Sequence, residues 1–175
     1  ENTKVVLGII HQLKKKKFKI SALSIKNGLK KVCWPARFQI LSKKPFLLID
    51  GAHNPAGIEA LKKELLARFY GKKIIFMLGF LRHKDYQNML KKLIPIAKSI
   101  VACEPDNPLA LKAEKITSFV GKSKISLIVR KKISEALKEC FSIAHKEDII
   151  CVCGSLYVVG EVIKIIGKFR KIYIR

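Results

Sequence analysis

The segment Asp50-Gly51-Ala52-His53-Asn54 places an acid, an imidazole and an amide within five residues of chain. A carboxylate accepts hydrogen bonds from hydroxyl groups, and an imidazole gains or loses a proton near neutral pH. Two other short segments carry groups of similar use, namely Arg82-His83-Lys84-Asp85 and Gly154-Ser155. An acid, a histidine, a lysine and a hydroxyl are together suited to bind a nucleotide and a carboxylate.

A buried strand must lead into the first of these segments. Residues 46–49 are four apolar residues in a row, followed by an acid and a glycine, which predicts a strand that ends in a tight turn. Pro55 is suited to the first position of a helix, and Leu61 and Leu65 follow at helical spacing. The segment therefore lies at the carboxyl end of a strand and at a helix N-terminus, where open α/β sheets bind ligands and favour anions.

The rest of the chain alternates strand and helix signals. Strands are expected at 38–41, 73–79, 99–103, 125–129 and 148–153, with a candidate edge strand at 169–174. Parallel strands need crossovers of about a dozen residues, so the pattern predicts an α/β fold. We expect a mostly parallel, Rossmann-like sheet of about six strands flanked by helices. The carboxyl ends of its strands lie along one edge, which brings the three polar segments together.

Residues 1–33 carry helical signals but no strand. Residues 4–17 have apolar side chains on one face, and Ser21 is suited to cap a second helix. Leu23, Ile25 and Leu29 of that helix are expected to be buried. Helices with no strand to pack on are explained most simply as the tail of a preceding domain. Because Pro35 restricts the residue before it, residues 34–38 are expected to link this tail to an α/β domain at 39–175.

Thirty-six lysines and arginines against thirteen acids give the chain a formal net charge of +23. A basic nucleic-acid-binding module is one interpretation, and a lysine-rich surface that attracts small anions is the other. Aromatic residues make up only 8% of the chain and lie mostly inside apolar runs, which favours the second interpretation. No apolar run reaches the ~18–20 residues of a membrane span, and no signal-peptide pattern is present. Five cysteines without framework spacing indicate a reducing compartment, so we expect a cytoplasmic protein.

The candidate residues also have purely structural interpretations. Asp50 could cap the following helix, His53 could bond only a backbone group, and Ser155 could be an ordinary N-cap. Cys151 and Cys153 share one face of a strand and are expected to be buried hydrophobes rather than a metal or redox pair. The other histidines, His11, His83 and His145, are expected at the surface.

Gly121-Lys122-Ser123 matches the end of the phosphate-binding loop G-x-x-x-x-G-K-[ST]. The first glycine of that pattern would fall at residue 116, which is Ile116, and the segment follows a helix rather than a strand. The chain therefore contains no phosphate-binding loop at this position.

Four segments together resemble the folylpolyglutamate synthase/dihydrofolate synthase family of the Mur ligase superfamily. They are residues 34–38 (WPARF), 50–55 (DGAHNP), the 79–85 loop and 154–161 (GSLYVVGE). The resemblance extends from about residue 33 to the end of the chain. It implies the smaller C-terminal α/β domain of such an enzyme, with 1–33 as the tail of the ATPase domain and 34–38 as the interdomain hinge.

The resemblance also implies roles for individual residues. Arg37 matches a hinge arginine that contacts ATP, and Asp50 matches an aspartate at the nucleotide ribose. His53 matches a catalytic histidine that faces the phosphates, and Ser155 and Lys84 would lie at the incoming L-glutamate. No metal ligand is expected in this chain, because Mg²⁺ and the phosphate-binding loop belong to the preceding domain.

The implied reaction is an ATP-dependent ligation, in which a folate or dihydropteroate carboxylate becomes an acyl phosphate that L-glutamate attacks. The chain alone is expected to be inactive, and the enzyme is expected to be a monomer. Two positions depart from the family's pattern, since His83 replaces an acid and Leu109 replaces an arginine. The alternatives are another Mur-type amino-acid ligase and, from a different class, the nucleic-acid-binding module.

Overall fold

The computed structural model describes residues 2–32, 34–121, 123 and 125–173. Cys33, where the expected tail ends, and Lys122 of the rejected phosphate loop lie outside the described residues. The chain divides into two compact units, Glu1–Pro35 and Ala36–Arg175, which are considered separately.

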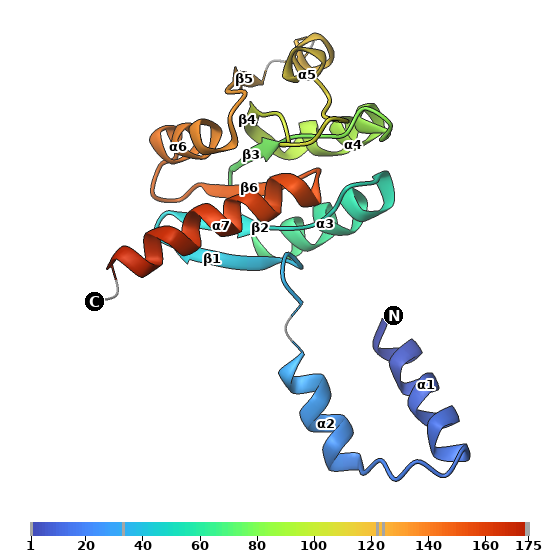
Figure 1. Ribbon diagram of the computed structural model, residues 1–175. Helices are drawn as coiled ribbons and strands as arrows, with labels where there is room; N and C mark the ends of the chain where they lie inside the picture. Colours follow the sequence, from blue (N-terminus) through green and yellow to red (C-terminus); the bar gives the residue numbers. More distant parts are fainter. Residues whose placement is uncertain (1, 33, 122, 124, 174–175) are drawn as a thin grey trace. The chain divides into compact units, whose positions relative to one another are not determined.

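The larger unit is built on a six-stranded sheet with the strand order β1-β2-β6-β3-β4-β5 (Figure 1). The strands are β1 Gln39–Lys43, β2 Phe46–Ile49, β3 Ile74–Leu78, β4 Ala97–Ala102, β5 Ser126–Val129 and β6 Ile149–Cys153. β1 pairs with β2 in antiparallel fashion, and the other four pairings are parallel. The expected mostly parallel α/β sheet is therefore confirmed, and β2, β6 and β3 are direct neighbours in it.

Helices cover both faces of the sheet. α3 (Pro55–Arg68), α4 (Tyr86–Leu93, followed by the short η1, Ile94–Ile96) and α5 (Ala113–Val120) bury their apolar sides in one cluster. α6 (Ile133–Ile143) and α7 (Leu156–Tyr173) bury theirs in a second cluster on the opposite face. The strands contribute alternate residues to the two clusters, as a pleated strand buried on both faces must.

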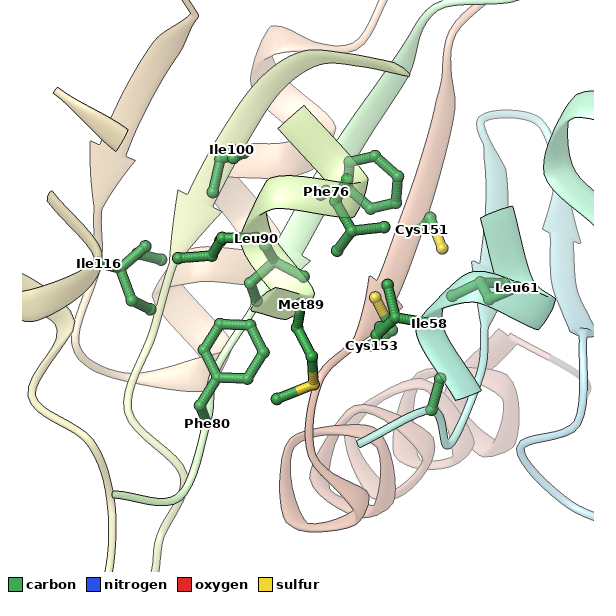
Figure 2. Packing of buried hydrophobic residues seen from close by; sticks show 14 of the residues in the cluster. Ile58, Leu61, Phe76, Phe80, Met89, Leu90, Ile100, Ile116, Cys151 and Cys153 are labelled. Carbon is green, nitrogen blue, oxygen red and sulfur yellow. The ribbon is translucent and has the colours of Figure 1, made fainter. Parts of the chain in front are cut away.

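The first cluster contains the two cysteines of β6. Figure 2 shows Cys151 and Cys153 beside the α3 residue Ile58, within a packed apolar group. Both cysteines are fully buried, which confirms that they pack as small hydrophobes. The hydrogen bond with Cys153 and the burial of the site hold the pKa of the Cys151 thiol well above its usual range.

The edge strand expected at 169–174 is wrong, because α7 continues to Tyr173; Ile174 lies outside the described residues. Val158 and Val162 are one helical turn apart and both buried in the second cluster, and Ile166 packs against it one turn later. The glycines of this segment, Gly160 and Gly167, cost the helix only about 1 kcal/mol each, which packing outweighs.

The smaller unit contains α1 (Asn2–Lys15) and α2 (Ala22–Lys31). Ser21 caps α2 as expected, since its hydroxyl oxygen accepts the Ser24 N–H at 2.9 Å. The expected burial of Leu23, Ile25 and Leu29 is wrong. The structure describes every residue of α2 and none is buried; Leu23 is 65% exposed and Leu29 37%. A unit of two short helices offers too little apolar surface to cover them.

None of the described helices is both long enough and apolar enough to cross a membrane.

Candidate functional site

The turn after β2 is held in shape by its own polar side chains. The Oδ1 atom of Asp50 accepts the Ala52 N–H at 2.8 Å, and its Oδ2 atom accepts the Phe38 N–H at 2.8 Å. Asn54 supplies the cap of α3, because its Oδ1 atom accepts the Gly57 N–H at 2.7 Å. The interpretation of Asp50 as the helix cap is therefore wrong. Asp50 instead ties the turn to the segment that enters β1.

That entering segment has an unusual backbone on both sides of Arg37. Ala36 and Phe38 have φ values of 61° and 41°, a region that costs a side-chain-bearing residue about 1–2 kcal/mol. Hydrogen bonds hold the segment there, since the Ala36 carbonyl accepts the Gly51 N–H at 2.6 Å and Asp50 accepts the Phe38 N–H. The backbone of Arg37 is thereby fixed beside the turn, while its side chain is exposed.

An aromatic contact also anchors this segment to α3. The Phe38 ring stacks on the ring of Phe69, at the end of α3, with 6.1 Å between centroids and an interplanar angle of 12°. The guanidinium of Arg68 lies 5.0 Å from the centroid of the Phe38 ring, within the range of a cation–π contact. The position of Arg37 is therefore set by packing as well as by hydrogen bonds.

His53 is oriented by the turn that carries it. Its Nδ1 atom lies 2.8 Å from the carbonyl oxygen of Gly51. A carbonyl only accepts, so Nδ1 carries the proton and Nε2 is the basic atom of the neutral ring. The backbone contact expected for His53 is thus present, and it leaves the second ring nitrogen for a ligand.

The turn after β6 brings a serine to the same edge of the sheet. Gly154 has a φ of 96°, and its N–H donates to the carbonyl of Ala52 at 2.8 Å. Ser155 follows, 3% exposed, with its Oγ accepting the Tyr157 N–H at 3.2 Å in the first turn of α7. The N-cap interpretation of Ser155 is confirmed. A capping hydroxyl still has its hydrogen to donate, so the cap does not exclude a ligand contact.

Residues from these strand ends line a cavity of about 300 Å³, which we call the site cavity. His53 enters it after β2, Lys84 after β3 and Ser155 after β6. Arg37 and Asp50 do not belong to its described lining. The complete lining consists of His53, Leu81, His83, Lys84, Asn107, Leu109 and residues 154–157.

Three polar residues of the site cavity were not predicted as site residues. His83 is exposed, as expected for a surface histidine, but it also lines the cavity. Tyr157 belongs to the first turn of α7, and Asn107 comes from the loop after β4. The signal available for Asn107 was its place at the carboxyl end of a strand, between two prolines. His83 and Leu109, the two positions expected to depart from the family's pattern, both line this one cavity.

The described lining of the site cavity carries a lysine and two imidazoles but no carboxylate. The acid that follows Lys84 in the chain, Asp85, is occupied as the cap of α4. Its two oxygens accept the backbone N–H of Asn88 at 3.2 Å and the side-chain amide of Asn88 at 2.7 Å. No carboxylate of the described lining neutralises the positive charge of Lys84, which favours a small anionic ligand.

Among the described residues, no three histidine, cysteine, aspartate or glutamate side chains are grouped so that they could hold one metal ion.

Comparison with known proteins identifies the family. The family model of the dihydrofolate synthetase C-terminal domain matches residues 37–165. The chain is 32% identical over 149 residues to the dihydrofolate synthase/folylpolyglutamate synthase of Bacillus subtilis, covering 83% of this chain and 33% of that protein. The enzyme of the same name from Escherichia coli is 27% identical over 151 residues, covering 86% of this chain and 35% of the relative.

Comparison with solved structures indicates the same family. The structure of E. coli FolC in complex with DHPP and ADP has a TM-score of 0.83 at 25% identity, covering 92% of this chain and 38% of that one. A bifunctional folylpolyglutamate synthase/dihydrofolate synthase with Mn, AMPPNP and L-glutamate bound has a TM-score of 0.79 at 25% identity, covering 89% and 37%. The chain thus spans little more than a third of the length of these relatives. It belongs to the family of dihydrofolate synthetase C-terminal domains, and the relatives named above are dihydrofolate and folylpolyglutamate synthases.

Proposed function

We propose that this chain is the C-terminal part of an ATP-dependent ligase that adds L-glutamate to a folate or dihydropteroate. The observation that carries the proposal is the site cavity, where Lys84, His53 and Ser155 meet without a carboxylate in the described lining. Its apolar residues Leu81 and Leu109 suit the methylene groups of glutamate, and its lysine suits a carboxylate. Residues 1–33 would then be the tail of a preceding ATPase domain, and 34–38 the hinge between the domains.

The nucleotide would lie at the hinge. Each carboxylate oxygen of Asp50 accepts one backbone N–H and retains a further lone pair for a ribose hydroxyl. Arg37, with its backbone fixed next to Asp50, would contact the phosphates. His53 would meet the transferred phosphoryl group through Nε2, because Nδ1 is bound to Gly51. A protonated Nε2 would stabilise the charge that develops there.

The reaction would proceed in two steps. The acceptor carboxylate attacks the γ-phosphorus of ATP, which gives an acyl phosphate and ADP. The amine of L-glutamate, held by Lys84 and Ser155, then attacks the acyl carbon, phosphate leaves, and the amine loses a proton to form the amide. Mg²⁺, which offsets phosphate charge, would be held by the preceding domain.

The test is ADP release by the full-length protein that contains this chain, with Mg·ATP and a reduced folate or dihydropteroate, with and without L-glutamate. We expect glutamate-dependent release that falls roughly 100-fold or more in His53→Ala, as for other groups that stabilise transition-state charge. His145→Ala, at an exposed histidine outside the described lining of the site cavity, is the matched control. The isolated 175-residue chain should release no ADP.

Absence of release with every folate and pteroate acceptor would refute the folate assignment. Release with a different amino acid would point instead to another Mur-type ligase. Tight, steeply salt-dependent binding of nucleic acid by the chain would favour the nucleic-acid-binding alternative.

A further inference from the structure

A second cavity lies next to the site cavity, and we call it the loop cavity. Its volume is about 630 Å³, and it is lined by Arg82, residues 104–108, residues 110–112 and Lys115. Asn107 lines both cavities, so they meet at this residue. The loop cavity lies at the carboxyl ends of β3 and β4, along the same edge of the sheet as the site.

The loops that form the loop cavity are fixed to each other by their backbones. Leu81 and Ala110 form an isolated antiparallel bridge, and the Arg82 N–H donates to the Leu109 carbonyl at 2.9 Å. Within the second loop, the Leu109 N–H donates to Oδ1 of Asn107 at 2.8 Å. The cavity is therefore formed before any ligand arrives, which lowers the entropic cost of binding.

The charges of the loop cavity leave two cations without an ion pair. Glu104 is only 16% exposed, and its oxygens accept from Lys112 and from the Ala113 N–H, both at 3.3 Å. Asp106, the other acid of the lining, is exposed. Arg82 and Lys115 form no ion pair with any residue that the structure describes. One comes from the loop after β3 and the other from the first turn of α5.

We propose that the loop cavity binds the glutamate tail of a glutamylated folate, with Arg82 and Lys115 each pairing with a carboxylate. The inference rests on the proposed function. A single carboxylate would need only one of these cations, whereas a chain of carboxylates can reach both across a cavity twice as large as the site cavity. Because Asn107 lines both cavities, a tail bound in the loop cavity would lie next to the site cavity.

Carboxylates fit this lining better than a polyphosphate does. Glu104 and Asp106 belong to the same lining and repel an anion in proportion to its charge. Singly charged groups spaced along a chain can approach Arg82 and Lys115 one at a time, while the closely spaced charges of a polyphosphate would also approach the two acids.

The experiment compares acceptors that carry one and three γ-linked glutamates, using the full-length protein. The measured quantity is the ratio of kcat/KM for the long acceptor to kcat/KM for the short one. We expect Arg82→Ala and Lys115→Ala each to lower this ratio up to about fivefold, as for a partly exposed ion pair, and to leave the short acceptor unaffected. Lys91→Ala, an exposed lysine of α4 outside both described linings, should not change the ratio.

The outcomes separate the two proposals. If the wild type ligates glutamate but the ratio is the same in all variants, the tail site is refuted and the proposed function stands. If the wild type ligates no glutamate to any folate, both are refuted. A second measurement titrates the 175-residue chain with γ-linked triglutamate and with tripolyphosphate. Binding of triglutamate that Arg82→Ala weakens supports the proposal, and binding of tripolyphosphate alone overturns it.

Discussion

Replacing Gly154 by alanine is a sharp test of how the site is built, because two independent features of the structure oppose a side chain there. The residue has a φ of 96°, which side-chain-bearing residues rarely adopt. An added Cβ would lie 2.7 Å from Cε1 of Phe80 and 2.9 Å from the carbonyl oxygen of Gly79. Phe80 is fully buried and Gly79 contributes backbone, so neither has room to withdraw.

The expected cost follows from these two features. A strained backbone of this kind costs about 1–3 kcal/mol, and overpacking a tight core costs a further 1–3 kcal/mol. We therefore expect Gly154→Ala to lower the free energy of unfolding by roughly 2–6 kcal/mol, a large share of the roughly 5–15 kcal/mol of an ordinary domain. Urea unfolding of the 175-residue chain, followed by circular dichroism, measures the difference.

Gly160→Ala is the matched control, since it makes the same chemical change in α7, six residues further along the chain. Nothing lies within 4 Å of its added Cβ, and alanine is preferred over glycine inside a helix by about 1 kcal/mol. The two variants should therefore shift stability in opposite directions. If Gly154→Ala unfolds within about 0.5 kcal/mol of the wild type, or shifts in the same direction as the control, the steric argument is refuted.

Three further predictions concern side chains with defined hydrogen bonds. Burial raises the pKa of Asp148, but the hydrogen bonds from Lys98 and from the His145 N–H outweigh it, so the pKa lies below its usual value near 3.9. The stability that this group contributes is present above that value and is lost as pH falls through the lowered one. Asp148→Asn should therefore cost about 1–3 kcal/mol at pH 7 and less at pH 3, measured by urea unfolding at both. Asn54→Ala should cost about 1 kcal/mol through loss of the α3 cap, and Asn54→Asp should retain most of that stability. Asp50→Asn should cost about 1–3 kcal/mol, because an amide oxygen can replace one carboxylate oxygen but the amide nitrogen cannot accept the second N–H. Faster hydrogen exchange at Phe38 or Ala52 would show which bond is lost, and unchanged exchange at both would contradict this account.

The parts of the fold that local sequence determines were predictable. The apolar run 46–49, the turn after it and Pro55 each specify their structure within a few residues, and the structure has a strand, a turn and a helix there. The predictions failed where tertiary packing, rather than the local sequence, determines the structure. The segment 169–174 has apolar residues that fit a strand or a helix. It continues the helix that begins at Leu156, in which Val158 and Val162 are buried at helical spacing, and α7 extends as far as Tyr173.

The site was predictable to the extent that it depends on strand ends. His53, Lys84 and Ser155 follow three strands that prove to be neighbours, so the general rule for parallel sheets brought them to one cavity. For Asn107 the same rule indicates only the edge of the sheet, because it lies in the loop after β4, several residues beyond the strand end. It reaches the cavity through the bridge between Leu81 and Ala110, a pairing between two loops that no local pattern encodes.

Asp50 has a structural role in the turn and a proposed role at the nucleotide ribose, so a variant at this position affects both. Its two oxygens hold the backbone on either side of the turn, including Phe38 next to Arg37. Loss of activity in Asp50→Ala would therefore follow from a misplaced Arg37 as readily as from a lost ribose contact. Hydrogen exchange distinguishes the two causes. A displaced hinge speeds exchange of the Phe38 N–H in the absence of nucleotide, whereas a lost ribose contact weakens only nucleotide binding. His53 carries no such ambiguity, since removing its ring breaks a single hydrogen bond to the Gly51 carbonyl. The activity of His53→Ala is accordingly the cleaner measure of chemistry at this site.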